Sequence, residues 1–223
     1  MSKPFLVFDM DGVLVEVTDS YRETISRTVE HFTGRAITRA EIQDYKNQGG
    51  WNDDWKLSHH IVCKTCPGVD LQTVTDYFQG IFFGDGADGL ILRERWVARE
   101  GLLERLDRHF QLAVFTGRIR SEAEFTLQRF CKLAFSPVVT TTEVARTKPA
   151  PDGLLMIREP GRPMWYVGDT VDDARCARSA EVPFIGIAAP GNPRYSELVA
   201  LFHEENAVAI LDDINQLETV LAK

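Results

Sequence analysis

The chain has 223 residues and a formal net charge of −8 at neutral pH, with 44% hydrophobic and 26% charged residues. This is the composition of an ordinary globular protein with one sizeable core, or with a core domain and a smaller one. The acidic balance argues against partners such as nucleic acid or an anionic membrane surface, because a phosphate backbone is bound by clustered Lys and Arg. It leaves open a small phosphate ligand, which needs only a local positive site or a metal ion.

The chain lacks the sequence marks of secretion or membrane insertion. No segment approaches the apolar length of a membrane span. The first apolar run, FLVF (5–8), is too short for the apolar region of a signal peptide, so we expect a cytoplasmic protein. Four cysteines are too few for a disulfide scaffold in a chain of this length.

Short apolar runs along the chain predict buried parallel strands. Helix-like stretches such as SEAEFTLQRF (121–130) and DDARCARSAE (172–181) lie between them. This alternation indicates βαβ units and an α/β fold, with a doubly wound, mostly parallel sheet that carries helices on both faces. The predicted strands are FLVF (5–8), LAVF (112–115), VVT (138–140), MWYV (164–167), FIGI (184–187) and AVAI (207–210).

The interval between the first two predicted strands is too long for one crossover connection. It contains no convincing buried strand, whereas residues 17–32 and 71–83 both have helical spacing of apolar residues. We therefore predict a helical domain inserted after the first strand, with the glycine-rich GDGADGLI (84–91) as its return hinge. The predicted boundaries are 1–16 and 92–223 for the core and 17–91 for the inserted domain.

Chemically active residue types follow four of the predicted strands. Ligands of open α/β sheets bind outside the carboxyl ends of the strands, so these residues are expected at one edge of the sheet. Turn chemistry explains any one of the groups, but not the convergence of a Lys with two acidic clusters. The groups are Asp9, Asp11 and Gly12 after the first strand, Thr116, Gly117 and Arg118 after the second, Lys148 downstream of the third, and Gly168, Asp169, Thr170, Asp172 and Asp173 after the fourth.

Four carboxylates brought together in this way would repel one another strongly. Lys148 offsets only one of the charges of Asp9, Asp11, Asp169 and Asp173. A bound divalent cation would offset two more. Because the candidate ligands are oxygens, without His or Cys, they favour Mg²⁺ over Zn²⁺.

Phosphoryl transfer fits this set of groups. An Asp carboxylate can act as the nucleophile and form an aspartyl-phosphate, while a metal ion, a Lys and hydrogen-bond donors stabilise the phosphoryl oxygens. Thr116 and the backbone N–H groups near Gly117 and Gly12 are reasonable donors.

The motifs that carry these residues resemble those of the haloacid dehalogenase-like hydrolases. DMDGV (9–13) resembles the first motif of that superfamily, FTGR (115–118) the second, KPAP (148–151) the third and GDTVDD (168–173) the fourth. All four occur in the order and spacing of the family. The resemblance implies a Rossmann-like core, and the predicted inserted domain matches the α-helical cap of the members that are similar to phosphoglycolate phosphatases.

The resemblance also implies a role for each motif residue. Asp11 would be the general acid for the leaving group and then the base for the attacking water, with its backbone carbonyl on the metal ion. Lys148 would also keep the nucleophile ionised. The remaining roles are nucleophile and metal ligand for Asp9, phosphoryl binding for Thr116 and Lys148, Mg²⁺ ligation for Asp169, and ligation or orientation of a metal-bound water for Asp173.

The presence of Asp11 argues for phosphoryl transfer, because the dehalogenases of the superfamily lack this second carboxylate. We therefore expect a Mg²⁺-dependent phosphatase, a phosphoric monoester hydrolase, that acts on a small phosphorylated metabolite through an aspartyl-phosphate on Asp9. The alternatives are a phosphomutase with the same four motifs and, less favoured, a non-catalytic binding protein on the same fold. The substrate stays open among phosphoglycolate, a sugar phosphate and an amino-alcohol phosphate, and the oligomeric state is open too.

The segment NQGGWNDDWKLSHH (47–60) is the most unusual part of the inserted domain. We interpret it as a specificity loop in which Gly50, Trp51 and Asn52 approach the substrate. The alternative is a break between helices, with Asn52 or Asp53 as the N-cap and Trp55 in the core of the inserted domain.

Two further residues have competing interpretations. Arg118 could reach the leaving group, or it could be a solvated Arg at a loop start. Asp172 is expected to be a charge at a helix start, favoured by the helix dipole, and not a ligand.

The stretch HHIVCKTC (59–66) places His59, Cys63 and Cys66 at spacings that zinc could use. A structural zinc site needs four ligands, and no second cluster lies nearby in the sequence. We expect incidental reduced thiols here.

Overall fold

The structure, a computed structural model, describes residues 2–84 and 88–221. Its main sheet has six parallel strands in the order β5-β4-β1-β6-β7-β8, which confirms the predicted α/β fold class. Every predicted run forms a strand, although the last strand begins two residues later than predicted. The strands are β1 (Phe5–Phe8), β4 (Gln111–Phe115), β5 (Val138–Val139), β6 (Met164–Gly168), β7 (Phe184–Ile187) and β8 (Ala209–Leu211).

Both faces of this sheet are buried, which is why its strands are continuous apolar runs without polar alternation. Phe5 and Val7 of β1 point into one hydrophobic cluster, and Leu6 and Phe8 point into another. Helices α7 (Asp152–Ile157), α8 (Val171–Ser179) and α9 (Tyr195–Glu204) contribute to the first cluster. Helices α5 (Leu102–His109), α6 (Arg120–Phe130) and α10 (Leu217–Leu221), with the 3₁₀ turn η3 (Ile214–Gln216), contribute to the second.

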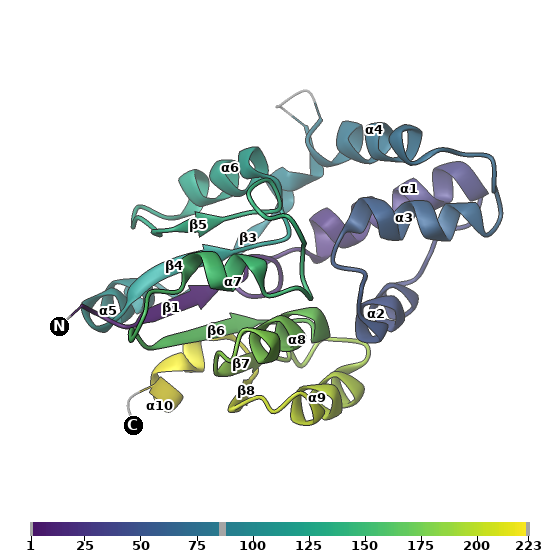
Figure 1. The fold of residues 1–223 in the computed structure, drawn as a ribbon. Helices are drawn as coiled ribbons and strands as arrows, with labels where there is room; N and C mark the ends of the chain where they lie inside the picture. Colours follow the sequence, from purple (N-terminus) through teal and green to yellow (C-terminus); the bar gives the residue numbers. More distant parts are fainter. Residues whose placement is uncertain (1, 85–87, 222–223) are drawn as a thin grey trace.

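The interval after the first strand is helical, as predicted. It contains a π-helical turn η1 (Thr18–Arg22) and the four inserted helices, which lie beyond the carboxyl ends of β1 and β6 (Figure 1). The 3₁₀ turn η2 (Leu90–Arg93) follows them. The inserted helices are α1 (Glu23–Thr33), α2 (Arg39–Gln48), α3 (Asp54–Cys63) and α4 (Leu71–Phe82).

Local sequence signals begin three of the inserted helices. Thr38 and Glu41 form a reciprocal capping box at the start of α2, and Asp53 and Asp70 are the N-caps of α3 and α4. These side chains satisfy backbone N–H groups that a helix leaves without partners at its first turn. Asp53, one of the two N-cap candidates in the sequence, is therefore the cap.

A two-stranded antiparallel ribbon, absent from the sequence prediction, joins the two connections to the inserted helices. Strand β2 (Val15–Glu16) leaves the core and pairs with β3 (Arg95–Trp96), which returns to it. Each of these two strands consists of one apolar and one charged residue, so neither forms an apolar run that would mark it in the sequence. Within the predicted hinge 84–91, residues 85–87 lie outside the described residues. The division into a core and an inserted domain at residues 16/17 and 91/92 stays a prediction.

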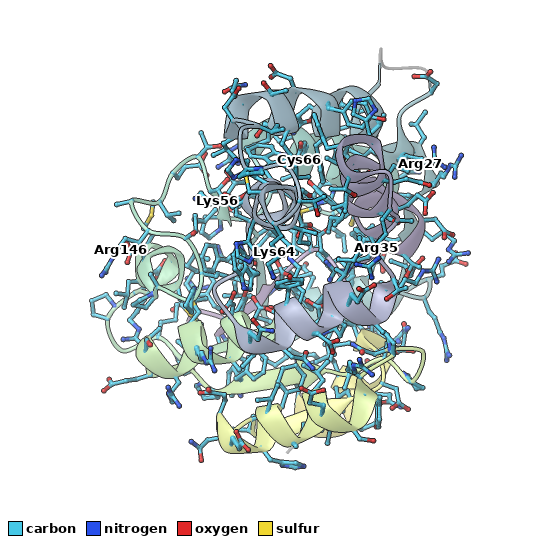
Figure 2. All side chains as sticks on the ribbon, turned by 90° about the vertical axis from the view of Figure 1, so that its right-hand side faces the viewer. Arg27, Arg35, Lys56, Lys64, Cys66 and Arg146 are labelled. Carbon is cyan, nitrogen blue, oxygen red and sulfur yellow. The ribbon has the colours of Figure 1, made fainter. Side chains whose placement is uncertain are left out.

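The outward face of the inserted helices carries scattered basic side chains, including Arg27, Arg35 and Lys56 (Figure 2). Each of these three has an acidic partner: Arg27 pairs with Glu23, Arg35 with Glu41 and Lys56 with Asp53. Such exposed pairs contribute little stability and leave a mixed-charge surface. Among the described helices, none is long and apolar enough to cross a membrane.

Two helical glycines test how tightly the core is packed. A Cβ added to Gly153 in α7 would lie 2.2 Å from the Phe115 ring, whereas one added to Gly80 in α4 meets no atom within 4 Å. We expect Gly153→Ala to lower the free energy of unfolding by about 1–3 kcal/mol through overpacking. Gly80→Ala should raise it by roughly 0.5–1 kcal/mol through helix propensity. Urea unfolding of both variants measures the contrast, and equal effects would contradict the packing described here.

Candidate functional site

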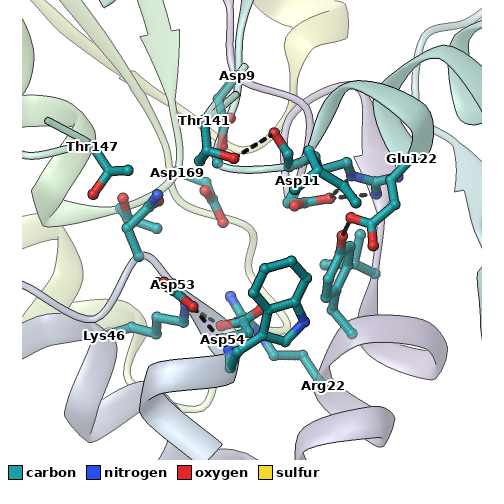
Figure 3. A pocket seen from close by; sticks show the side chains of 18 residues that line it. Asp9, Asp11, Arg22, Lys46, Asp53, Asp54, Glu122, Thr141, Thr147 and Asp169 are labelled. Carbon is teal, nitrogen blue, oxygen red and sulfur yellow. Dashed lines mark hydrogen bonds and ion pairs between the residues drawn. The ribbon is translucent and has the colours of Figure 1, made fainter. Parts of the chain in front are cut away.

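A cavity of about 240 Å³ lies between the carboxyl edge of the sheet and the inserted helices (Figure 3). Residues from both sides line it, including Asp9, Asp11 and Asp169 from the sheet edge. The other lining residues are Val17, Tyr21, Arg22, Lys46, Asn52, Asp53, Asp54, Trp55, Gly117, Arg118, Ile119, Glu122, Thr141, Thr147 and Thr170.

Lys148 joins the first and fourth motifs in space. Its Nζ lies 2.8 Å from Oδ1 of Asp9 and 2.7 Å from Oδ1 of Asp173, and it donates to the Tyr166 hydroxyl at 3.0 Å. All of these groups are buried. Burial alone would lower the pKa of the Lys148 ammonium, but Asp173 and Asp9 outweigh burial and raise it. Lys148 is therefore a permanent positive charge beside Asp9.

Asp173 is fully occupied by protein donors. Oδ1 accepts from Lys148 and from the Tyr166 hydroxyl, both at 2.7 Å, and Oδ2 accepts from the backbone N–H and hydroxyl of Thr170 at 3.0 and 2.6 Å. Burial would raise the pKa of Asp173, but Lys148 and these hydrogen bonds hold it below its usual range. A carboxylate has about four lone-pair sites. Four donors leave Asp173 little capacity to ligate a metal ion directly.

The carboxylates around Lys148 carry more negative charge than it can balance. Oxygens of Asp9, Asp169 and Asp173 lie within 4.8 Å of one another, the only such cluster of His, Cys, Asp or Glu among residues 2–84 and 88–221. The pKa of Asp9 is raised to about 7, mainly by burial. Lys148 lowers this pKa, but the charges of Asp173 and Asp11 raise it further. Burial and the neighbouring Asp173 and Asp9 raise the pKa of Asp169 well above its usual range. The raised pKa values mean that Asp9 and Asp169 ionise fully at neutral pH only if a further cation is bound. Because all the candidate ligands are oxygens, a hard divalent metal ion fits this cluster.

Gly12 has a specific structural reason to be glycine. Its φ is +73°, and a Cβ at this position would lie 2.0 Å from Oδ2 of Asp169. Any other residue would be strained in the left-handed region and would displace the Asp169 carboxylate. Gly12 therefore allows the first and fourth motifs to approach each other.

Two residues of the second motif, Gly117 and Arg118, line the cavity, whereas Thr116 is not among the lining residues. The Thr116 side chain is buried, and its hydroxyl accepts the backbone N–H of Arg118 at 3.2 Å. Gly117 lines the cavity directly. A Cβ on Gly117 would lie 2.5 Å from Nδ2 of Asn52, so this glycine lets the inserted segment come close to the core.

One of the two sequence interpretations of Arg118, a solvated residue at a loop start, is wrong. Its side chain has 0% exposure, so it is not a solvated loop residue. Its Nε and Nη2 donate to Asp11, Nη2 and Nη1 donate to Glu94, and Nη1 donates to Thr126. These bonds use all five N–H donors of the guanidinium. Arg118 also lines the cavity, so its contact with a leaving group stays a prediction, although its N–H donors are engaged within the protein in this structure.

Of the three residues predicted in the specificity loop, only Asn52 lines the cavity. Its Nδ2 is buried without a hydrogen-bond partner among the described residues. Gly50 instead donates its N–H to the Asp172 carboxylate at 2.8 Å, and the Trp51 ring packs against His60 with centroids 4.4 Å apart. Gly50 and Trp51 are not among the residues that line the cavity, because composition shows which loop is unusual but not which of its residues face inward.

Asp172 occupies the first turn of α8, as expected for a helix-start charge. Burial raises its pKa despite the hydrogen bond from Gly50. Arg175 of the same helix donates to the Gln48 carbonyl at 3.2 Å. The start of α8 thus holds the loop that carries Asn52 against the core.

Several residues of the cavity wall were missed by sequence reasoning. Arg22 lies in the π-helical turn η1, a distortion that frequently occurs at functional sites but that no sequence signal marks. Lys46 is buried and donates to the Trp51 carbonyl at 2.7 Å and to Asp54 at 2.5 Å. The unusual composition of the segment 47–60, which carries Asn52 and Trp55, was the only sequence signal near Lys46. No sequence signal marked the other missed residues Tyr21, Glu122, Thr141 and Thr147.

The HHIVCKTC segment holds no zinc-like cluster in the part of the chain that the structure describes. Sγ of Cys63 lies 3.2 Å from Nε2 of His59, and Sγ of Cys66 donates to the Phe32 carbonyl. All four cysteines are free thiols, as expected.

Comparisons with known proteins place the chain among enzymes of one family. The family model described as haloacid dehalogenase-like hydrolase matches residues 6–187. A curated relative from Phytophthora nicotianae, named imidazoleglycerol-phosphate dehydratase, is 35% identical over 83% of this chain. The match covers only 43% of that relative's length.

Solved structures with the same fold include two phosphatases by title. The phosphatase Tt82 from Thermococcus thioreducens is 28% identical, with a TM-score of 0.64 over 88% of this chain and 98% of that one. A predicted phosphoglycolate phosphatase from Haemophilus somnus is 16% identical, with a TM-score of 0.74 over 99% of both chains. Together with the four motifs gathered at one edge of a doubly wound sheet, the family match shows that this chain belongs to the haloacid dehalogenase-like hydrolases.

Proposed function

We propose that this hydrolase is a Mg²⁺-dependent phosphatase that cleaves a small phosphate monoester through an aspartyl-phosphate on Asp9. The observation that supports this most directly is the position of Asp9. Its carboxylate lines the cavity, contacts Lys148 at 2.8 Å and lies in a cluster of carboxylates that needs a further cation. The identity with the Thermococcus phosphatase supports phosphatase activity.

Asp9, Asp169 and the backbone carbonyl of Asp11 would hold the Mg²⁺ ion. Asp173 would act indirectly, because its lone pairs already accept from Lys148, Tyr166 and Thr170. When bound, the ion supplies positive charge that keeps Asp9 ionised and stabilises the phosphoryl oxygens.

The protein residues account for both halves of the reaction. An Asp9 oxygen attacks phosphorus while the ester oxygen leaves with a proton from Asp11. Water then attacks the phosphoryl group on Asp9 and gives its proton to Asp11. Lys148 and the N–H groups near Gly117 stabilise charge on the phosphoryl oxygens.

The cavity favours a small leaving group. Its volume of about 240 Å³ must hold both the phosphoryl group and the rest of the substrate. The inserted helices, which we propose form a cap domain of residues 17–91, contribute Lys46, Asn52 and Trp55 to its wall. Opening of this cap would admit the substrate, and closure would exclude water.

A test of the proposed mechanism concerns the nucleophile. Asp9→Asn should reduce Mg²⁺-dependent phosphate release to background, because an amide cannot form the phosphoenzyme. Asp11→Asn should lower kcat by about 10²- to 10⁴-fold through loss of proton transfer. The measurement is phosphate release from a panel containing phosphoglycolate, sugar phosphates, amino-alcohol phosphates and, given the name of the Phytophthora relative, imidazoleglycerol phosphate.

Asp152→Asn is the matched control, since Asp152 pairs with Arg146 on the surface and should keep wild-type rates. Full activity of Asp9→Asn would exclude the proposed mechanism. Isomerisation of a sugar phosphate without release of phosphate would instead identify a phosphomutase.

A further prediction concerns the dependence of thermal stability on pH and on Mg²⁺. The pKa of Asp9 is about 7 in the folded protein against an ordinary 3.8, so proton binding stabilises the metal-free fold at low pH. That contribution is lost as the pH rises from about 4 through 7. Mg²⁺ competes with this proton, so the increase in Tm on adding MgCl₂ should be larger at pH 8 than at pH 5.5.

Thermal unfolding in EDTA and in MgCl₂ at both pH values measures this difference. Asp9→Asn should reduce the pH dependence between the two buffers, because the amide does not titrate, and Asp169, whose pKa is also raised, accounts for the remainder. A Mg²⁺-induced shift of the same size at both pH values would show that Asp9 does not bind the ion.

A further inference from the structure

The guanidinium of Arg118 lies in a fully buried polar network outside the phosphoryl-binding groups. Arg118 and Glu94 have side chains with 0% exposure, and Nη2 of Arg118 donates to Oε1 of Glu94 at 2.6 Å. Thr126 closes the network, since its hydroxyl accepts from Nη1 of Arg118 at 2.7 Å and donates to Oε2 of Glu94 at 2.8 Å. The Tyr21 ring covers the guanidinium at 5.0 Å.

This network fixes one particular oxygen of Asp11. Nε of Arg118 donates to Oδ1 of Asp11 at 2.9 Å, and Nη2 donates to the same oxygen. No protein donor to Oδ2 is recorded among the described residues, and the Asp11 side chain is 27% exposed at the cavity wall. Because a guanidinium carries only donors, a proton on Asp11 must reside on Oδ2.

We propose that Arg118, itself oriented by Glu94, is a positioning residue that makes Oδ2 of Asp11 the oxygen that exchanges protons with the substrate. The inference rests on the proposed phosphatase function. As the P–O ester bond breaks, the Oδ2 proton moves to the leaving oxygen, and Asp11 becomes a carboxylate. In the second half of the reaction, the proton of the attacking water returns to Oδ2.

Two of the residues around Arg118 lie on the two chain segments that join the core to the inserted helices. Glu94 follows η2 on the return connection, and Tyr21 belongs to η1 on the outgoing connection. The Tyr21 hydroxyl donates to Glu122 at 2.6 Å, and Gln79 of α4 donates to the same carboxylate at 2.8 Å. Arg118 therefore contacts both connections as well as Asp11, so the orientation of Asp11 depends on the placement of the inserted helices.

The test uses leaving groups that differ in their need for a proton. The double variant Arg118→Met/Glu94→Gln removes both buried charges together, which avoids leaving either one unpaired. Its kcat/KM for phenyl phosphate should fall about 100-fold, because phenolate leaves poorly without protonation. Its kcat/KM for p-nitrophenyl phosphate should change less than about threefold, because nitrophenolate needs no general acid. The quantity kcat/KM is chosen because it reports the step in which the leaving group departs.

Two further variants complete the design. Glu94→Gln alone should shift the ratio of the two kcat/KM values in the same direction by a smaller factor, and it serves if the double variant does not fold. Arg120→Met is the matched control, since Arg120, the first residue of α6, forms a partly exposed pair with Glu143 in a turn of the core, and the variant should leave the ratio unchanged.

The outcomes separate this inference from the proposed function. Two results in the folded variants would overturn the positioning role: an equal loss of kcat/KM on both esters, or no loss on either. Both results would leave the proposed phosphatase function standing, provided that the Asp9→Asn variant is inactive. Absence of Mg²⁺-dependent turnover of either ester by the wild-type protein would instead count against the proposed function, and with it the inference.

Discussion

The Lys148 ammonium lies between the Asp9 and Asp173 carboxylates, 2.8 and 2.7 Å from their nearest oxygens, in a fully buried position. Without it, the turns after β1 and β6 would bring uncompensated carboxylates together at the carboxyl edge of the sheet. With it, one negative charge is balanced, and the pKa of Asp9 still reaches about 7. The cluster is thus still short of positive charge, as expected of carboxylates that could hold a metal ion.

The inserted helices complete this site, because the sheet edge alone does not enclose a cavity. Their loop contributes Asn52, which approaches Gly117, and is held to the core by the hydrogen bond from Gly50 to Asp172. The buried Arg118 network contacts both connections to these helices. The enclosure of the cavity and the orientation of the Asp11 side chain therefore depend on the same connections.

Prediction from the sequence succeeded where the signal was local or repeated along the chain. Apolar runs such as FLVF (5–8) located all six parallel strands, and the order of elements located the helical insertion. The motif residues of the sheet edge meet because parallel strands end at a common edge. The sequence did not indicate the surroundings of Gly50, Trp51 and Arg118, which are formed by partners such as Asp172, His60 and Glu94 that come from other parts of the chain.

The sequence by itself determined the family, the doubly wound sheet and the convergence of Asp9, Lys148 and Asp169, because these follow from hydrophobic periodicity and from motif order. Only the tertiary structure decided which side chains enclose the cavity and which oxygens remain free to act. Those properties depend on contacts between segments far apart in the chain, such as the bond from Arg118 to Asp11, 107 residues away. No periodicity or spacing encodes such a contact, because it arises only when separate elements pack together.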